Sequence, residues 1–213
     1  MRLWFNSKLE KTPEPAKKRV ERKLEVHRSL ALNILFHQFR ESQHYRILDL
    51  GRAFGQNVDF FSQFSCKLHI EDLYDSLSSF DYFSPSDGFS YETVYSYLLP
   101  FFKNAPFDII LAWDLFNHLD RNEFKHLILH LGQYSKKGTM LFTLISMEKH
   151  IPEKPVQFKI VDEEHLLYLT DPGVMKKCPK WEKSDLDHLM PNFRVCNSFL
   201  LRNGFKEYLF LYE

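Results

Sequence analysis

Residues 45–57 read YRILDLGRAFGQN, and this stretch decides the fold. A short apolar run ends in Asp49, and Gly51 and Gly55 follow before a segment that can begin a helix. This order is typical of a parallel strand that leads through a tight turn into a helix N-terminus. Such a turn brings bare backbone close to a ligand, and the helix dipole favours polar or anionic groups there. Glycines also serve ordinary turns, so the meaning of this pair depends on the rest of the chain.

The composition is that of a globular protein. Of the 213 residues, 44% are hydrophobic and 26% are charged, and we expect them to form a single domain over residues 1–213. Lys+Arg and Asp+Glu each total 28, so no overall electrostatic field favours nucleic acid or a membrane surface as a partner. The composition does not indicate an oligomeric state.

The cysteines and the hydropathy favour a reducing compartment. Cys66, Cys178 and Cys196 are far apart and form neither a CxxC pair nor a Cys/His zinc spacing, so no metal site is expected. The N-terminus lacks the apolar core of a signal peptide, and no apolar run approaches the roughly 18 residues that span a bilayer. We therefore predict a soluble, cytoplasmic protein with no membrane partner.

Apolar periodicity predicts that strands and helices alternate up to residue 146. The run FDIILAW at 107–113 is almost continuously apolar, as buried parallel strands are. Asp120 can cap the following helix, whose first turn holds Glu123. Residues 1–18 should form a flexible lead-in. A doubly wound sheet should have a third strand between 73 and 106, but the pattern does not place it. The other expected elements are helices over Arg19–Glu41, Asn57–Phe64 and Tyr91–Phe102 and strands over Tyr45–Leu50, Lys67–Glu71 and Thr139–Ser146.

The last part of the chain departs from this alternation. Residues 147–180, with short strands expected over Gln157–Val161 and Leu166–Thr170, have the pattern of an insertion over a sheet edge. Asn203–Gly204 joins two further β-rich segments, which predicts a hairpin with a type I′ turn. The expected fold is α/β, a doubly wound, Rossmann-like, mostly parallel sheet with a C-terminal antiparallel β-hairpin. The hairpin strands are expected over Arg194–Arg202 and Phe205–Tyr212, after a helix that Ser184 caps and that ends at Met190.

Together, these features over about residues 30–213 resemble the class I S-adenosylmethionine-dependent methyltransferases. That family usually carries D/E-x-G-x-G-x-G in its first loop, and here Ala53 takes the place of the middle glycine. The resemblance implies that S-adenosyl-L-methionine is the cofactor. It also implies that the first loop and the start of the next helix bind it, through Asp49, Gly51, Ala53, Gly55 and Asn57.

The family also has an acid at the end of its second strand, which accepts hydrogen bonds from the ribose hydroxyls. Glu71 is our first candidate for this position and Asp72 our second, because one ionised carboxylate can accept both hydroxyl donors. In an alternative interpretation, the two acids only cap the helix that follows. The acid that often ends the third strand is absent, although Leu98–Phe101 is similar to the stretch that accompanies it.

In the family, the segment after the fourth strand lines the cofactor and the mouth of the substrate site. The resemblance therefore implies that Trp113 and Asp114 flank the cofactor. His118 is a candidate general base for a substrate hydroxyl or amine; alternatively, it only stabilises the start of the next helix. The Asn-Pro-Pro-Tyr motif of some amino-methylating members is absent.

The implied function is S-adenosylmethionine-dependent transfer of a methyl group to an unidentified acceptor, expected to be a small molecule. The helix at 19–41 and the insertion at 147–180 are expected to cover the open side of the site. Two alternatives are a nicotinamide- or flavin-binding Rossmann protein and a methyltransferase-like scaffold that no longer catalyses. Five polar or aromatic residues in or next to the insertion are candidates for substrate contacts, although plain surface placement is the preferred interpretation of each: Tyr168, Lys176, Lys177, Trp181 and His165.

Overall fold

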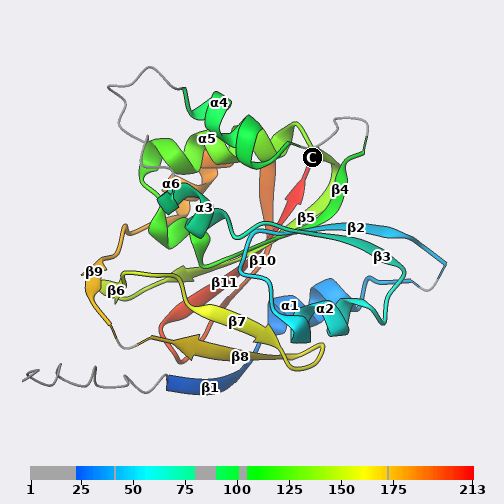
Figure 1. Cartoon of the computed structure of the whole chain (residues 1–213), viewed down its shortest axis with the longest axis horizontal. Coiled ribbons are helices and arrows are strands. Elements are labelled where there is room, and N and C mark those ends of the chain that lie inside the picture. Colours follow the sequence, from blue (N-terminus) through cyan, green and yellow to red (C-terminus); the bar gives the residue numbers. More distant parts are fainter. Residues whose placement is uncertain (1–22, 41, 80–89, 101–104, 172) are drawn as a thin grey trace, which may run out of the picture.

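The computed structural model describes residues 23–40, 42–79, 90–100, 105–171 and 173–213. Within these residues, six strands form a central mixed sheet in the order β10–β11–β5–β4–β2–β3 (Figure 1). The four strands from β5 to β3 are parallel, and β11 and β10 are antiparallel to their neighbours. The expected α/β class is thus confirmed. The strands are β2 (Tyr45–Asp49), β3 (Cys66–Ile70), β4 (Phe107–Trp113), β5 (Ser135–Ser146), β10 (Phe193–Leu200) and β11 (Phe205–Tyr212).

Helices cover both faces of this sheet (Figure 1). Because side chains alternate along a strand, Ile109 and Leu111 of β4 face one apolar core while Ile110 and Ala112 face the other. All residues of β4 except Asp108 are buried, as its continuous apolar run predicts. One face carries α1 (Leu30–Phe36) and α2 (Gly55–Phe61), and the other carries α3 (Leu73–Ser79), α4 (Tyr91–Leu98), α5 (Arg121–Gly132) and α6 (Lys183–Leu189).

The predicted cap of α5 is confirmed. The Asp120 carboxylate accepts hydrogen bonds from the backbone N–H groups of Asn122 and Glu123, and the Glu123 carboxylate accepts one from the Asp120 N–H. The predicted cap of α6 is wrong by two residues. Glu182 rather than Ser184 is the N-cap, because it forms a capping box with Asp185.

The predicted helix over Arg19–Glu41 is wrong in its first part. Residues Lys23–Arg28 form β1, and only Leu30–Phe36 are α-helical, with the Ser29 hydroxyl accepting from Leu32 N at 3.1 Å. β1 pairs antiparallel with β8 (His165–Thr170), and β8 also pairs with β7 (Gln157–Ile160). The long-range pairing of β1 overrides the local helical spacing. Both short strands predicted in the insertion are present, and this three-stranded sheet packs on the face that carries α1 and α2 (Figure 1).

The turn between β10 and β11 differs from the predicted one. A type I′ turn needs positive φ at both central residues, whereas here only Gly204 has one, at 83°. β10 ends at Leu200 and β11 begins at Phe205, so the loop is longer than a two-residue turn. Met147 N donates to the Gly204 carbonyl at 2.8 Å.

Two further expectations concern segments at the limits of the described chain. The helix expected to reach Phe102 ends at Leu98, and β3 is the edge strand of the central sheet in the part of the chain that the structure describes. The lead-in at 1–18 lies outside the described residues.

Two short strands, β6 (His150–Pro152) and β9 (Met175–Lys177), form a separate antiparallel ribbon. Among the described helices, none has the length and apolarity needed to cross a membrane. The three cysteines are free thiols.

Candidate functional site

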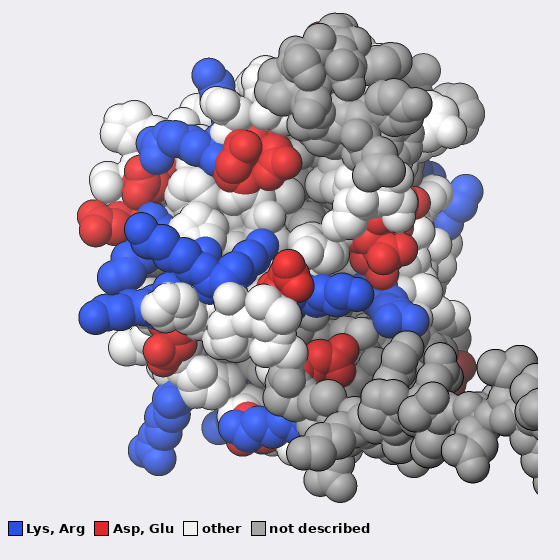
Figure 2. All heavy atoms as spheres, turned by 60° about the vertical axis from the view of Figure 1, so that its left-hand side comes forward, with Lys and Arg blue, Asp and Glu red and all other residues white. Residues whose placement is uncertain are grey.

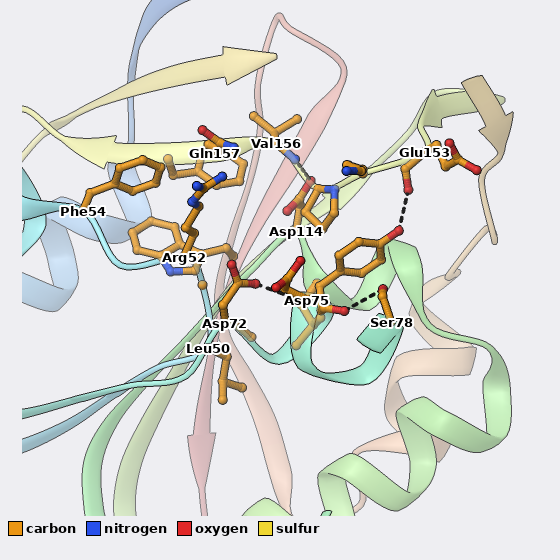
Figure 3. Close-up of a pocket in the computed structure, with 18 residues that line it drawn as sticks. Leu50, Arg52, Phe54, Asp72, Asp75, Ser78, Asp114, Glu153, Val156 and Gln157 are labelled. Atoms are coloured by element: carbon orange, nitrogen blue, oxygen red, sulfur yellow. Dashed lines mark hydrogen bonds between the residues drawn. The ribbon is translucent and has the colours of Figure 1, made fainter. Parts of the chain in front are cut away.

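A cavity of about 410 Å³ opens at the carboxyl ends of β2, β3 and β4 (Figure 3). We call it the main cavity. This edge of an open α/β sheet is where such folds bind ligands, and the volume suits a small molecule. Its lining comes from the three loops that follow the strands and from the insertion: 50–52 and 54, 72, 74, 75 and 78, 112–115, and 153–158.

Asp49 and Trp113 fix the ends of the two central strands under this cavity. The indole Nε1 of Trp113 donates to Asp49 Oδ1 at 2.5 Å, and Gly51 N donates to the same oxygen at 2.9 Å. Asp49 is 1% exposed and its Oδ2 has no partner, so burial raises the pKa of this carboxyl to about 6. Trp113 has a φ of 49°, a rare backbone conformation for a residue without glycine's freedom. Such conformations are often found at functional sites.

The glycines of the first loop have different surroundings. A Cβ atom added to Gly51 would lie 2.6 Å from Trp113 Cδ1, so only glycine allows the backbone to approach the indole. Gly55 has open space around it, and neither Gly55 nor Ala53 lines the main cavity. The φ of Ala53 is not positive, so alanine fits the loop without backbone strain.

Of the two candidate acids, only Asp72 lines the main cavity, where Figure 3 shows it near Arg52. Burial raises the pKa of the Asp72 carboxyl, and the nearby Arg52 guanidinium opposes that rise. Glu71 does not line the cavity, and its Oε1 accepts a hydrogen bond from Ser76 Oγ at 2.5 Å.

Asp114 links the end of β4 to the insertion. Its Oδ2 accepts a hydrogen bond from Val156 N at 2.9 Å, which holds the insertion over the main cavity. The same oxygen lies 3.5 Å from His118 Nε2. The His118 side chain is 1% exposed, its Nδ1 has no hydrogen-bond partner, and its ring meets that of Tyr74 edge to face.

Asn57 has a structural position that the sequence did not reveal. Its Nδ2 donates to the Phe158 carbonyl at 3.2 Å, and its Oδ1 accepts from Ile160 N at 2.8 Å. The buried amide therefore ties α2 to β7 and does not line the main cavity.

Residues 153–158 of the insertion line the main cavity, whereas no described residue of the segment 23–40 does. Three of the candidate substrate contacts lie elsewhere. Tyr168 is buried against Phe158, and Trp181 donates from Nε1 to the Phe116 carbonyl at 2.8 Å. His165 is paired with Asp162 at the surface.

Lys176 and Lys177 line a second and more open cleft, of about 900 Å³, beside the β6–β9 ribbon. We call it the lysine cleft, after Lys149, Lys176, Lys177 and Lys180, which line it. His118 lines this cleft too. Because His118 contacts Asp114 and Tyr74, which line the main cavity, the two spaces adjoin at these side chains.

Several residues of the main cavity were not among the sequence candidates. Phe158 stacks on Trp113 with ring centroids 5.5 Å apart, and Gln157 lies opposite Arg52 in Figure 3. Arg52 follows Gly51 and Tyr74 lies two residues after Asp72, so their closeness to predicted site residues could have identified them as candidates. Phe158 and Gln157 carried none, because their position depends on how the insertion folds back.

No group of three His, Cys, Asp or Glu side chains that could hold a metal ion occurs among the described residues.

No protein-family model matches the chain, and no curated protein matches it. Solved structures do match. The PH0226 protein from Pyrococcus horikoshii is 12% identical with a TM-score of 0.51, over 86% of this chain and 88% of that one. This likeness shows a shared fold.

Two S-adenosylmethionine-dependent methyltransferases of known structure also match, each at 12% identity with a TM-score of 0.49. The one from Clostridium acetobutylicum aligns over 85% of this chain and 90% of its own. The one from Methanosarcina mazei aligns over 84% of this chain and 96% of its own.

Proposed function

We propose that this protein is an S-adenosylmethionine-dependent methyltransferase that acts on a small-molecule acceptor. The observation that carries the proposal is the main cavity, which joins the close-packed backbone at Gly51 to the Asp72 carboxylate at the carboxyl edge of the sheet. A backbone turn and an acid in this arrangement suit an adenosyl group, because the carboxylate can accept hydrogen bonds from ribose hydroxyls.

The charges of the main cavity also suit this cofactor. Its lining holds four carboxylates against the two cations Arg52 and Lys154, which favours a ligand that carries a sulfonium and an amine. The orphan Oδ2 of Asp49 adds a buried acceptor directly below the loop. When bound, the cofactor supplies an electrophilic methyl group, whose bond to sulfur breaks and leaves a neutral thioether. The four carboxylates are Asp72, Asp75, Asp114 and Glu153.

The chain's own part is to position the acceptor and to receive its proton. The free Nδ1 of His118 is the atom that we assign to take this proton. Asp114 Oδ2, 3.5 Å from Nε2 on the other side of the ring, orients the imidazole. The insertion excludes water from above, since 153–158 lie over the cavity.

Calorimetric titration with S-adenosylmethionine tests the proposal, and the chain offers a matched pair of variants for it. We expect Asp72→Asn to weaken binding on the order of tenfold or more, because it removes a charged acceptor at the cavity. Glu71→Gln, one residue away and outside the cavity, should bind as the wild type does.

Other outcomes would contradict the proposal. No heat of binding at millimolar cofactor would leave the scaffold hypothesis, and binding of NADH instead would favour a nicotinamide enzyme. Equal losses of S-adenosylmethionine affinity in the two variants would show that Asp72 does not bind the cofactor.

A further inference from the structure

Four ammonium groups of the lysine cleft have no acidic partner. Lys149, Lys176, Lys177 and Lys180 form no ion pair with any carboxylate that the structure describes. Other cations do pair, as Lys136 does with Asp108 at 2.6 Å. Figure 2 brings this side of the molecule forward and shows Lys and Arg side chains gathered on it. Like charges repel one another, so an anion bound among these ammonium groups would be stabilised by several of them together.

Two acids, Asp120 and Glu123, also line the lysine cleft, and both make hydrogen bonds within the N-terminus of α5. The Asp120 carboxylate is occupied by the N-cap of α5, where it accepts from Asn122 N at 2.7 Å and Glu123 N at 2.8 Å. Glu123 Oε2 accepts from Asp120 N at 2.6 Å. Both carboxylates thus serve the helix terminus.

The backbone holds the lysines in place. In the β6–β9 ribbon, His150 pairs with Lys177 and the buried Ile151 pairs with Lys176, which anchors the ribbon to the protein. Cys178 N donates to the Lys149 carbonyl at 3.0 Å and closes the end of the ribbon. The cationic side chains therefore project from a fixed frame rather than from a free loop.

A second, independent feature connects the lysine cleft to the chemistry. His118 lines the cleft with a side chain that is almost fully buried, and its Nδ1 has no partner. The Lys176 ammonium lies 5.9 Å from the centre of the Tyr74 ring, which itself lines the main cavity. Burial lowers the pKa of Lys176, and the nearby carboxylates of Glu123 and Asp114 oppose this.

We propose that the lysine cleft binds the phosphate group of a phosphorylated small-molecule acceptor and so presents the rest of that molecule at His118. This inference rests on the proposed function, because it assigns the acceptor class for the same site. Lysine ammonium groups are suited to phosphate, and several together match a group with more than one negative charge. The size of the cleft suits a small molecule, which distinguishes the proposal from a nucleic-acid partner.

Binding of inorganic pyrophosphate to the full chain, followed by calorimetry and by NMR, tests this inference without any need for activity. We expect pyrophosphate to shift the His118 ring resonances and to bind more weakly as salt rises. Lys177→Gln/Lys180→Gln, at two exposed positions, should lower the affinity on the order of tenfold or more. The matched control is Lys67→Gln/Lys137→Gln, which removes two exposed lysines near the amino ends of β3 and β5 and should leave the affinity unchanged.

Three outcomes would overturn the inference. Equal losses in the two double variants would mean that pyrophosphate responds only to overall charge. Absence of any shift at His118 would place the anion elsewhere. A single-stranded RNA oligomer that binds tightly while pyrophosphate does not would identify a nucleic-acid surface.

S-adenosylmethionine titrated into the same variants separates this inference from the proposed function. We expect cofactor binding to be unchanged, because neither Lys177 nor Lys180 lines the main cavity. If pyrophosphate selects the lysine cleft but the cofactor does not bind to any variant, the methyltransferase assignment fails and only the anion site remains.

Discussion

Trp113 Nε1 and Asp49 Oδ1 are joined by a 2.5 Å hydrogen bond that ties the end of β4 to the end of β2. The bond sets the indole directly against Gly51 and flat against Phe158, so one side chain closes both the first loop and the insertion over the main cavity. The positive φ of Trp113 aims the indole in this direction. Strain at this residue is thus coupled to the shape of the candidate site.

Asp49→Asn should change how stability depends on pH. Burial raises the pKa of Asp49 from 3.8 to about 6, so the folded state holds this proton more tightly than the unfolded state does. The wild type therefore loses stability from this group as pH rises through that window, by about 3 kcal/mol in all. Asn keeps an acceptor for Trp113 and Gly51 without the charge. Urea unfolding between pH 4.5 and 7.5 should show that the variant gains stability relative to the wild type as pH rises.

Asp59→Asn, at an exposed position of α2, gives the baseline for that comparison. A constant difference between Asp49→Asn and the wild type across the pH range would mean that Asp49 is ionised throughout.

Gly51→Ala should destabilise the protein by about 1–3 kcal/mol, because the added Cβ overlaps the Trp113 indole and forces it away from Asp49. Chemical unfolding measures the loss, and tryptophan fluorescence should report the displaced indole. Gly55→Ala is the control. Nothing lies within 4 Å of its Cβ, and alanine favours the helix that begins there, so stability should be equal or higher by up to about 1 kcal/mol. Equal stabilities for the two variants would refute the close approach at Gly51.

Asn57→Ala should loosen β7, because Ile160 N and the Phe158 carbonyl lose their side-chain partner in a buried place. We expect a loss of about 2–4 kcal/mol and faster amide exchange at 157–160. Gln56→Ala is a milder comparison, since its side chain makes one bond, to the Ile160 carbonyl, from an exposed position. Similar exchange rates at 157–160 in both variants would show that the Asn57 amide does not hold the strand.

The elements that the sequence predicted well have local patterns that agree with their tertiary roles. The apolar run of β4 is buried on both faces, and the cap at Asp120 depends on only four consecutive residues. The same reasoning failed at β1, because its partner β8 lies far along the chain and no local signal reports that pairing.

The candidate site likewise has one part that local sequence predicted and another part that depends on tertiary contacts. The glycine loop and the segment after β4 were found because their residues are contiguous in sequence. The sequence could not show which of the two adjacent acids, Glu71 or Asp72, lines the main cavity, because both also hydrogen-bond to residues of α3 and only the path of the chain after β3 separates them. The two bonds of Asn57 depend on how the insertion folds back onto α2.

β8 lies between β1 and β7 and therefore needs both as neighbours. During synthesis, β1 leaves the ribosome long before β8 does, and it has no partner in this sheet until residue 170 has emerged. The three-stranded sheet, whose strand β7 belongs to the insertion that lines the main cavity, is thus among the later parts of the molecule that can form. A nascent chain stalled before that point would expose a lone strand that is prone to pairing with other chains.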